Sequence, residues 1–244
     1  MAAPAKLTET LRITGTRPDG YHEIDAEMLS LDLADELTFD HGDGLEVLGA
    51  TGMPLAADDD NLVRRALAAV RRTAKVRLRK RIPVGAGLGG GSADAAAVLR
   101  WAGCTDLALA ASLGADVPFC LVGGRARVRG IGEVVAPLAA VDRTYTLLVP
   151  PFGVSTAEVY RSWDSLGRPE GEHGNDLEPA ALAVSPALHA YRERLAQASG
   201  LIPRLAGSGT TWFVVGAFPG GDRIVVRTAP TTTSSWPGVG SGSA

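Results

Sequence analysis

The stretch from Pro83 to Leu99, which reads PVGAGLGGGSADAAAVL, constrains the fold of this chain more than any other. Five of the nine residues from Gly85 to Ala93 are glycine, and glycine lets a backbone adopt positive φ and approach a ligand closely. The preceding residues, 75–82, alternate apolar and basic side chains, which predicts a strand. The alanine-rich residues that follow predict a helix with Ser92 as its N-cap. A strand, a glycine loop and a helix N-terminus together favour a backbone cradle for phosphate groups.

Two phosphate-binding templates can be compared with this stretch. The P-loop template fails, because no Gly-Lys-Ser/Thr ends the glycine run. The dinucleotide template GxGxxG is met by Gly85, Gly87 and Gly90, but it also needs an acidic residue about 20 positions later. The chain has Ala110 and Ala111 there. A glycine-rich turn with only a structural role is the remaining alternative, and the dense glycine run directly before a helix disfavours it.

The rest of the chain mixes predicted strands and helices without the regular order of a doubly wound sheet. Two strands, around 11–13 and 24–39, are joined by a turn at Pro18-Asp19-Gly20. Further strands are predicted at 45–48, 125–129, 133–138, 145–149 and 224–226, and helices at 61–73, 106–113, 156–163 and 186–199. The pattern predicts an α+β fold in two parts, divided at Pro150-Pro151 into residues 1–150 and 151–228. Residues 229–244 lack a hydrophobic pattern, which predicts a disordered tail.

Composition and charge exclude several classes of function. The formal net charge is −3, so no strong positive field attracts nucleic acid. The basic run from Arg77 to Arg81 is read as a solvated strand face that can bias the nearby loop toward anions. The two cysteines and four histidines show no metal-ligand or disulfide spacing. No apolar run reaches the roughly 18 residues of a membrane span, and no signal-peptide pattern is present. We therefore expect a cytoplasmic protein without nucleic-acid, membrane or metal-cluster partners.

The glycine stretch resembles the ATP-binding motif of the GHMP small-molecule kinases. Further stretches are similar to the branch of that superfamily that phosphorylates diphosphocytidyl methylerythritol: APAKL at 3–7, RPDGYHE at 17–23, GADVPF at 114–119 and GNDLE at 174–178. The stretch AGSGTTWF at 206–213 is similar to the superfamily's C-terminal motif. These matches run in family order from residue 3 to about 215.

The resemblance implies a fold and an activity. It implies an N-terminal ribosomal-S5-like ATP-binding domain and a ferredoxin-like C-terminal domain, here trimmed because the stretch after Val215 is short. The implied activity is ATP-dependent phosphorylation of the 2-hydroxyl of diphosphocytidyl methylerythritol in non-mevalonate isoprenoid biosynthesis. ATP and Mg²⁺ are the implied cofactors, and the partner is this small molecule, bound by a monomer or a homodimer.

The resemblance also implies catalytic and nucleotide-binding residues. Asp116 would accept the alcohol proton, and Lys6 would be its electrostatic partner. The alternatives are an N-cap aspartate and a solvated lysine. Asn61 resembles a position near the adenine, although it could equally be a helix N-cap. The residues expected to cradle the phosphates are Pro83, Val84, Gly85, Ala86, Gly87, Leu88, Gly89, Gly90, Gly91, Ser92 and Ala93.

On the substrate side, the resemblance implies that Tyr21 stacks on cytosine and His22 contacts its polar edge. Tyr160 is either a second stacking face or a helix-packing residue. Gly207, Ser208 and Gly209 would place backbone N–H groups near the transferred phosphate or the methylerythritol, unless they form a plain turn. Thr8 stands where the family usually has asparagine. Asn175 and Asp176 are expected to have a structural role.

Three other functions stay open at this point. A kinase of the same superfamily could act on another alcohol, such as homoserine or a mevalonate-type acid. A dinucleotide-binding oxidoreductase would use the GxGxxG pattern and bind NAD(P). A catalytically silent nucleotide-binding relative would fit the departure at Thr8 and the short C-terminal part.

Overall fold

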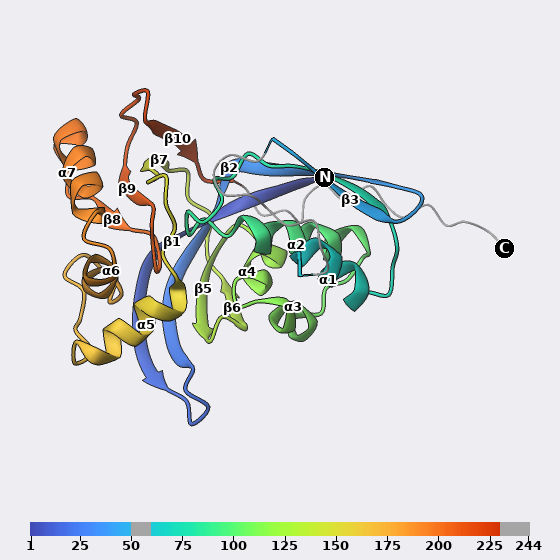
Figure 1. Cartoon of the computed structure of the whole chain (residues 1–244), viewed down its shortest axis with the longest axis horizontal. Helices are drawn as coiled ribbons and strands as arrows, with labels where there is room; N and C mark the ends of the chain where they lie inside the picture. The colour runs from blue at the N-terminus through green and yellow to red at the C-terminus, as the bar shows by residue number, and fades with distance from the viewer. Residues whose placement is uncertain (50–59, 230–244) are drawn as a thin grey trace.

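The computed structural model describes residues 1–49 and 60–229 of the chain. These residues form two β-sheets, each covered by helices, so the α+β expectation is confirmed (Figure 1). Most of the tail expected at 229–244 lies outside the described residues. Among the described helices, none is long and apolar enough to span a bilayer.

The first sheet has six strands and is built around one long hairpin. Its strands are β1 (Ala2–Thr16), β2 (His22–Asp40), β3 (Gly44–Leu48), β4 (Lys75–Arg79), β5 (Arg125–Gly130) and β6 (Val134–Pro137). The order is β3-β4-β2-β5-β6, and β1 pairs antiparallel with β2 from Ala2 opposite Glu36 to Thr16 opposite His22. The predicted turn at residues 18–20 closes this hairpin, and Gly20 has a positive φ of 88° there.

Four helices belong to the first sheet: α1 (Leu62–Ala69), α2 (Gly90–Trp101), α3 (Leu107–Leu113) and α4 (Val117–Val122). The central one is α2, whose residues from Ala93 to Arg100 are all buried. A helix that is apolar around most of its circumference needs partners on every side, and α2 packs against α1, α4 and β1. The small alanine side chains allow these close approaches.

The expected N-cap at Ser92 is wrong. The helix begins at Gly90, and its N-cap is Gly89, which adopts the left-handed conformation with φ 67°. Ser92 therefore lies inside the first turn of the helix and is not its cap. Glycine replaces the serine cap because the backbone must turn with positive φ, which serine adopts only with strain.

The second sheet contains β7 (Thr144–Leu148), β8 (Arg204–Leu205), β9 (Trp212–Val215) and β10 (Arg223–Arg227). Its order is β10-β7-β9-β8 with every neighbouring pair antiparallel. This is the strand order of a ferredoxin-like sheet, and it is trimmed because residues 216–222 join β9 to β10 without a helix. Helices α5 (Thr156–Ser165), α6 (Glu178–Val184) and α7 (Leu188–Ser199) all lie between β7 and β8 in the chain.

Several details of the fold were not expected from the sequence. The strand β7 belongs to the second sheet although it precedes Pro150, so the division at residue 150 stays a prediction. Helices α4 and α6 were not predicted, because each is short and carries a proline near its start. Figure 1 shows α5 lying beside the β1–β2 hairpin, which brings the second part against the first.

Candidate active site

Two cavities meet at the glycine loop. The larger one, of about 740 Å³, lies between the hairpin, α5, the start of α4 and the turn after β8. The smaller one, of about 310 Å³, is lined by the whole loop from Pro83 to Gly91, with Asn61, Lys80 and Asp94. Gly87 and Gly89 border both cavities. A phosphate bound by the loop would therefore be accessible from either side.

Asp116 and Lys6 form an ion pair in the larger cavity. The Asp116 carboxylate lies 3.2 Å from the Lys6 ammonium, and the two side chains are 31% and 7% exposed. Asp116 occupies the N-cap position of α4, but its side chain makes no cap hydrogen bond. The structure thus excludes the two alternatives for these residues. Asp116 does not cap the helix with its side chain, and Lys6 is not a solvated lysine. Lys6 also donates a hydrogen bond to the Thr8 hydroxyl at 3.0 Å, so Thr8 contributes to holding the ammonium.

The glycine loop approaches its neighbours too closely for side chains. A Cβ on Gly87 would lie 2.2 Å from the Gly209 carbonyl oxygen, and one on Gly89 would lie 2.7 Å from Lys6 Cγ. Both glycines have positive φ, 75° and 67°. The backbone N–H of Lys6 donates to the Leu88 carbonyl at 2.9 Å, which ties β1 to the loop. The glycine loop and the Asp116–Lys6 ion pair are therefore fixed relative to each other.

The basic run beside the loop is neutralised by carboxylates. On the exposed face, Arg77 pairs with Asp40 and Arg81 with Glu36. The interpretation of this run as a solvated strand face therefore holds for these two arginines. Lys80 instead points inward, where it has two carboxylate partners.

Lys80 is buried between Asp35 and Asp94, beneath the loop. It donates to both carboxylates, at 2.8 Å to Asp94. Asp35 also accepts from the backbone N–H groups of Arg81 and Ile82, at 2.5 and 2.8 Å, where the chain enters the loop. Burial raises the pKa of Asp94 to about 7, against the lowering effect of Lys80. One Asp94 oxygen, Oδ1, has no hydrogen-bond partner among the described residues.

Aromatic side chains form the far end of the larger cavity. His22 stacks on Tyr160, with 4.9 Å between ring centroids and an interplanar angle of 24°, and meets the edge of Trp163. The His22 Nε2 lies 3.0 Å from the Asp164 carboxylate. Tyr21, at the tip of the hairpin, is 61% exposed and borders the same cavity. Burial, and next the negative charge of Asp116, raise the pKa of Tyr160.

Trp163 and Asp164 were missed by the sequence reasoning. They lie three and four residues after Tyr160 on α5, a spacing that places side chains on one face of a helix. Because Tyr160 was already a candidate, this spacing was the signal that could have identified Trp163 and Asp164.

A second glycine turn, formed by Gly207, Ser208 and Gly209, lies beside Lys6. Gly207 and Ser208 line the larger cavity, and a Cβ on Gly207 would be 3.8 Å from the Lys6 ammonium. Gly209 does not line either cavity and instead contacts the backbone of Gly87. This turn therefore packs against both the glycine loop and Lys6 of the ion pair.

Buried polar side chains hold that turn, in agreement with the structural role expected for residues 175 and 176. Asn175 donates to the carbonyl oxygens of Leu205 and Gly207, at 2.9 and 2.7 Å. Asp176 accepts from the backbone N–H of Ile13 at 2.9 Å. Asn61 caps α1 by accepting from the Val63 N–H at 2.9 Å, as one of its two interpretations expects. It also lines the smaller cavity, and its position near an adenine stays a prediction.

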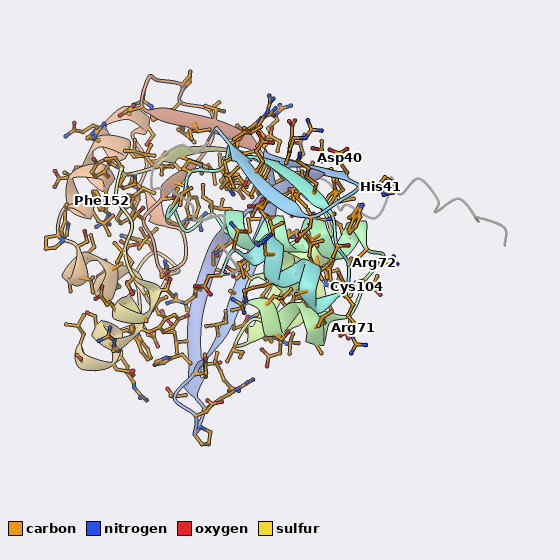
Figure 2. The ribbon with its side chains drawn as sticks, turned by 45° about the vertical axis from the view of Figure 1, so that its right-hand side comes forward. Asp40, His41, Arg71, Arg72, Cys104 and Phe152 are labelled. Carbon is orange, nitrogen blue, oxygen red and sulfur yellow. The ribbon has the colours of Figure 1, made fainter. Side chains whose placement is uncertain are left out.

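An all-protein metal cluster and a disulfide are both absent from the described residues. Among them, no group of three or more His, Cys, Asp or Glu side chains is placed to hold a metal ion. Both cysteines are free thiols, and burial raises the pKa of Cys120 to about 12. Cys104 lies at the end of the molecule opposite Phe152 and the second part (Figure 2).

Comparison with known proteins identifies the family. Residues 61–124 match the N-terminal domain of the GHMP kinases. A 4-diphosphocytidyl-2-C-methyl-D-erythritol kinase of Paracoccus denitrificans is 42% identical over 87% of this chain and 85% of its own length. One of Pelotomaculum thermopropionicum is 40% identical over 86% of each.

Solved structures agree with these sequence matches. A crystal structure of 4-(cytidine 5'-diphospho)-2C-methyl-D-erythritol kinase superimposes with a TM-score of 0.73 at 32% identity, covering 94% of this chain and 99% of that one. A homoserine kinase from Cytophaga hutchinsonii shares the fold, with a TM-score of 0.56 at 18% identity over 93% of this chain and 95% of that one. The chain therefore belongs to the GHMP kinases and, within them, to the 4-diphosphocytidyl-2-C-methyl-D-erythritol kinase family.

Proposed function

We propose that this chain transfers the γ-phosphoryl group of ATP to a hydroxyl of 4-diphosphocytidyl-2-C-methyl-D-erythritol, its 2-hydroxyl, as the family resemblance implies. The observation that carries the proposal is the position of the Asp116–Lys6 ion pair, which lies in the larger cavity beside the two glycines that border both cavities. ATP would occupy the smaller cavity with its phosphates at the glycine loop. The alcohol would occupy the larger cavity, with its hydroxyl at Asp116.

Each catalytic group then has a chemical task. The Asp116 carboxylate accepts the hydroxyl proton as the oxygen attacks the γ-phosphorus, and the bond from that phosphorus to the β–γ bridging oxygen breaks, releasing ADP. The Lys6 ammonium pairs with the Asp116 carboxylate and offsets negative charge that develops on the phosphoryl oxygens. Backbone N–H groups of the loop and the N-terminus of α2 face the phosphates.

The residues present fit a magnesium ion. Mg²⁺ in such sites is usually held by one or two carboxylates together with substrate phosphates, and Asp116 offers a partly exposed carboxylate beside the loop. When bound, Mg²⁺ would neutralise charge on the transferred group. At the far end of the cavity, the aromatic rings of Tyr21, His22 and Tyr160 supply stacking surfaces for a pyrimidine base.

The test is ADP release from ATP and Mg²⁺, with and without the diphosphocytidyl substrate. The wild type should release ADP only with that substrate, and Asp116→Asn should lower kcat about 10²–10⁴-fold, because a positioned base contributes that much. The KM for ATP should change little, since Asp116 does not line the smaller cavity.

Asp43→Asn is the control for this test, because its exposed side chain lies outside both cavities. Full activity in Asp116→Asn would exclude its role as the base. Turnover of homoserine, with none of the diphosphocytidyl compound, would overturn the proposed substrate.

A further inference from the structure

The larger cavity has one basic side chain that the ion pairs leave unused. Three basic residues line it: Lys6, His22 and Arg161. Lys6 pairs with Asp116, and His22 contacts Asp164. Arg161 pairs with no acidic side chain among the described residues, and its Nε donates a hydrogen bond to the Ala157 carbonyl at 3.3 Å. Both terminal nitrogens of its guanidinium are thus available to a ligand.

The acidic side chains of the cavity do not compete for Arg161. Asp164 lies three residues further along α5, but it interacts with His22 and with Arg168, at 3.0 Å in each case. Asp116 interacts with Lys6. A bound anion would therefore balance the positive charge of Arg161 on this side of the larger cavity.

The position of Arg161 on α5 suggests which anion. It directly follows Tyr160, whose ring stacks on His22 at the aromatic end, while the reacting hydroxyl is assigned to Asp116. A diphosphocytidyl substrate carries its base at one end, its alcohol at the other and a diphosphate between them. The guanidinium fork matches the geometry of phosphate oxygens and can donate two parallel hydrogen bonds.

We propose that Arg161 binds the diphosphate bridge of the alcohol substrate and sets the preference for a diphosphate-linked cytidine over an uncharged alcohol. This inference rests on the proposed function, because that function places the substrate in the larger cavity. Arg161 does not line the smaller cavity. Its effect should therefore fall on the alcohol substrate and leave ATP binding unchanged.

The experiment compares Arg161→Gln and Arg161→Lys with a control variant of another exposed arginine. Like Arg161, the control arginine pairs with no acidic side chain among the described residues. Arg72→Gln serves this purpose, because Arg72 lies outside both cavities, at the end of the molecule away from the second part (Figure 2). Calorimetry measures the Kd of cytidine, CMP and CDP for each variant. Steady-state kinetics measures kcat and the two KM values.

Arg161→Gln should weaken CDP binding about tenfold or more and leave the Kd of cytidine within about twofold, because a charge-assisted pair is lost only when phosphate is present. The KM for the diphosphocytidyl substrate should rise by a similar factor, with the KM for ATP unchanged. Arg161→Lys should recover part of the CDP affinity, and Arg72→Gln should match the wild type.

Two results would overturn the inference. In the first, Arg161→Gln binds CDP as tightly as the wild type. In the second, the variant loses cytidine and CDP affinity equally, which indicates only a structural role for the arginine. The binding comparison tests the role of Arg161 without turnover, so the two proposals can fail separately. A wild type that binds CDP more tightly than cytidine but releases no ADP would overturn the kinase proposal alone.

Discussion

At the scale of single residues, Asp94 shows how burial changes the chemistry of a carboxyl group. It shares the Lys80 ammonium with Asp35, so two carboxylates and one ammonium are enclosed together beneath the glycine loop. Desolvation disfavours the charged carboxylate, which raises the pKa of Asp94 to about 7. The unpartnered Oδ1 of Asp94 agrees with a carboxyl group that holds a proton in the folded state.

The raised pKa predicts a pH-dependent stability. The unfolded chain releases the Asp94 proton near pH 4 and the folded chain near pH 7. The folded state thus binds more protons between these values, and its stability falls as pH rises through this window. Relative to Asp94→Asn, which cannot ionise, the wild type should lose roughly 1–4 kcal/mol of unfolding free energy between pH 4 and 8.

Urea unfolding of both proteins across this pH range measures the difference. Asp25→Asn tests the sign, because a hydrogen bond from Arg127 lowers the pKa of the Asp25 carboxyl. The stability from Asp25 should therefore disappear as pH falls, opposite to the effect of Asp94. Parallel pH curves for the wild type and Asp94→Asn would show that Asp94 keeps an ordinary pKa.

Sequence reasoning found individual residues best where a motif surrounds them. The stretches around Lys6 and Asp116 marked both residues, although 110 positions separate them, and the structure brings their charges to 3.2 Å. Asp164 and Arg161 carry no such motif. Their places in the cavity depend on how α5 lies against the hairpin, which local sequence patterns do not determine.

At the scale of elements, the junction of the glycine loop and α2 contacts Lys6, which we propose acts with Asp116 in catalysis. The sequence predicted the strand, loop and helix in order, but it placed the cap at Ser92. The reason lies in tertiary contacts: Lys6 packs where a side chain on Gly89 would stand, and the left-handed turn at Gly89 starts the helix three residues earlier. Cap preferences of isolated helices contain no information about such a neighbour.

Gly89→Ala should therefore impair catalysis more than stability. The left-handed φ costs an alanine about 1–2 kcal/mol. The new Cβ, 2.7 Å from Lys6 Cγ, must displace the side chain that pairs with Asp116. We expect kcat to fall at least about tenfold, since misplacing a catalytic group by a fraction of an ångström to one ångström costs that much or more.

Thermal melting and steady-state kinetics of Gly89→Ala give the two readouts. Gly91→Ala is the matched control for stability, because Gly91 lies in the first turn of α2 without a left-handed φ. Alanine there should leave the melting temperature unchanged or raise it. Wild-type kcat in Gly89→Ala would show that Lys6 has room to move aside without loss.

At the scale of the whole molecule, the active site depends on the contact between the two sheets. The sequence predicted the α+β class and every strand except β8 and β9, because alternation and turn residues are local signals. It could not predict that β7 joins the second sheet, or the β10-β7-β9-β8 order, because strand pairing depends on contacts distant in sequence. The segment 174–176 provides one such contact, because it lies along β1. The Leu11 N–H donates to the Gly174 carbonyl, and the Asp176 N–H donates to the Leu11 carbonyl.

Asn175 transmits this contact to the site. Its amide donates to Leu205 and Gly207 from a buried position, and its oxygen accepts from the Leu177 N–H at 3.0 Å. Asn175→Ala would leave these three backbone groups without their partner. Because an unsatisfied buried group costs about 1–3 kcal/mol, we expect a loss of roughly 2–4 kcal/mol in unfolding free energy.

The same variant should also lower kcat well below its melting temperature, because the released turn carries Gly207 away from Lys6. Ser199→Ala, which removes a hydrogen bond to the Leu195 carbonyl on α7, is the control for destabilisation without contact to either cavity. Chemical unfolding and kinetics at one temperature separate the two effects. If Asn175→Ala lost stability but kept its full kcat, the second sheet would contribute only folding energy, and phosphoryl transfer would depend on the first sheet alone.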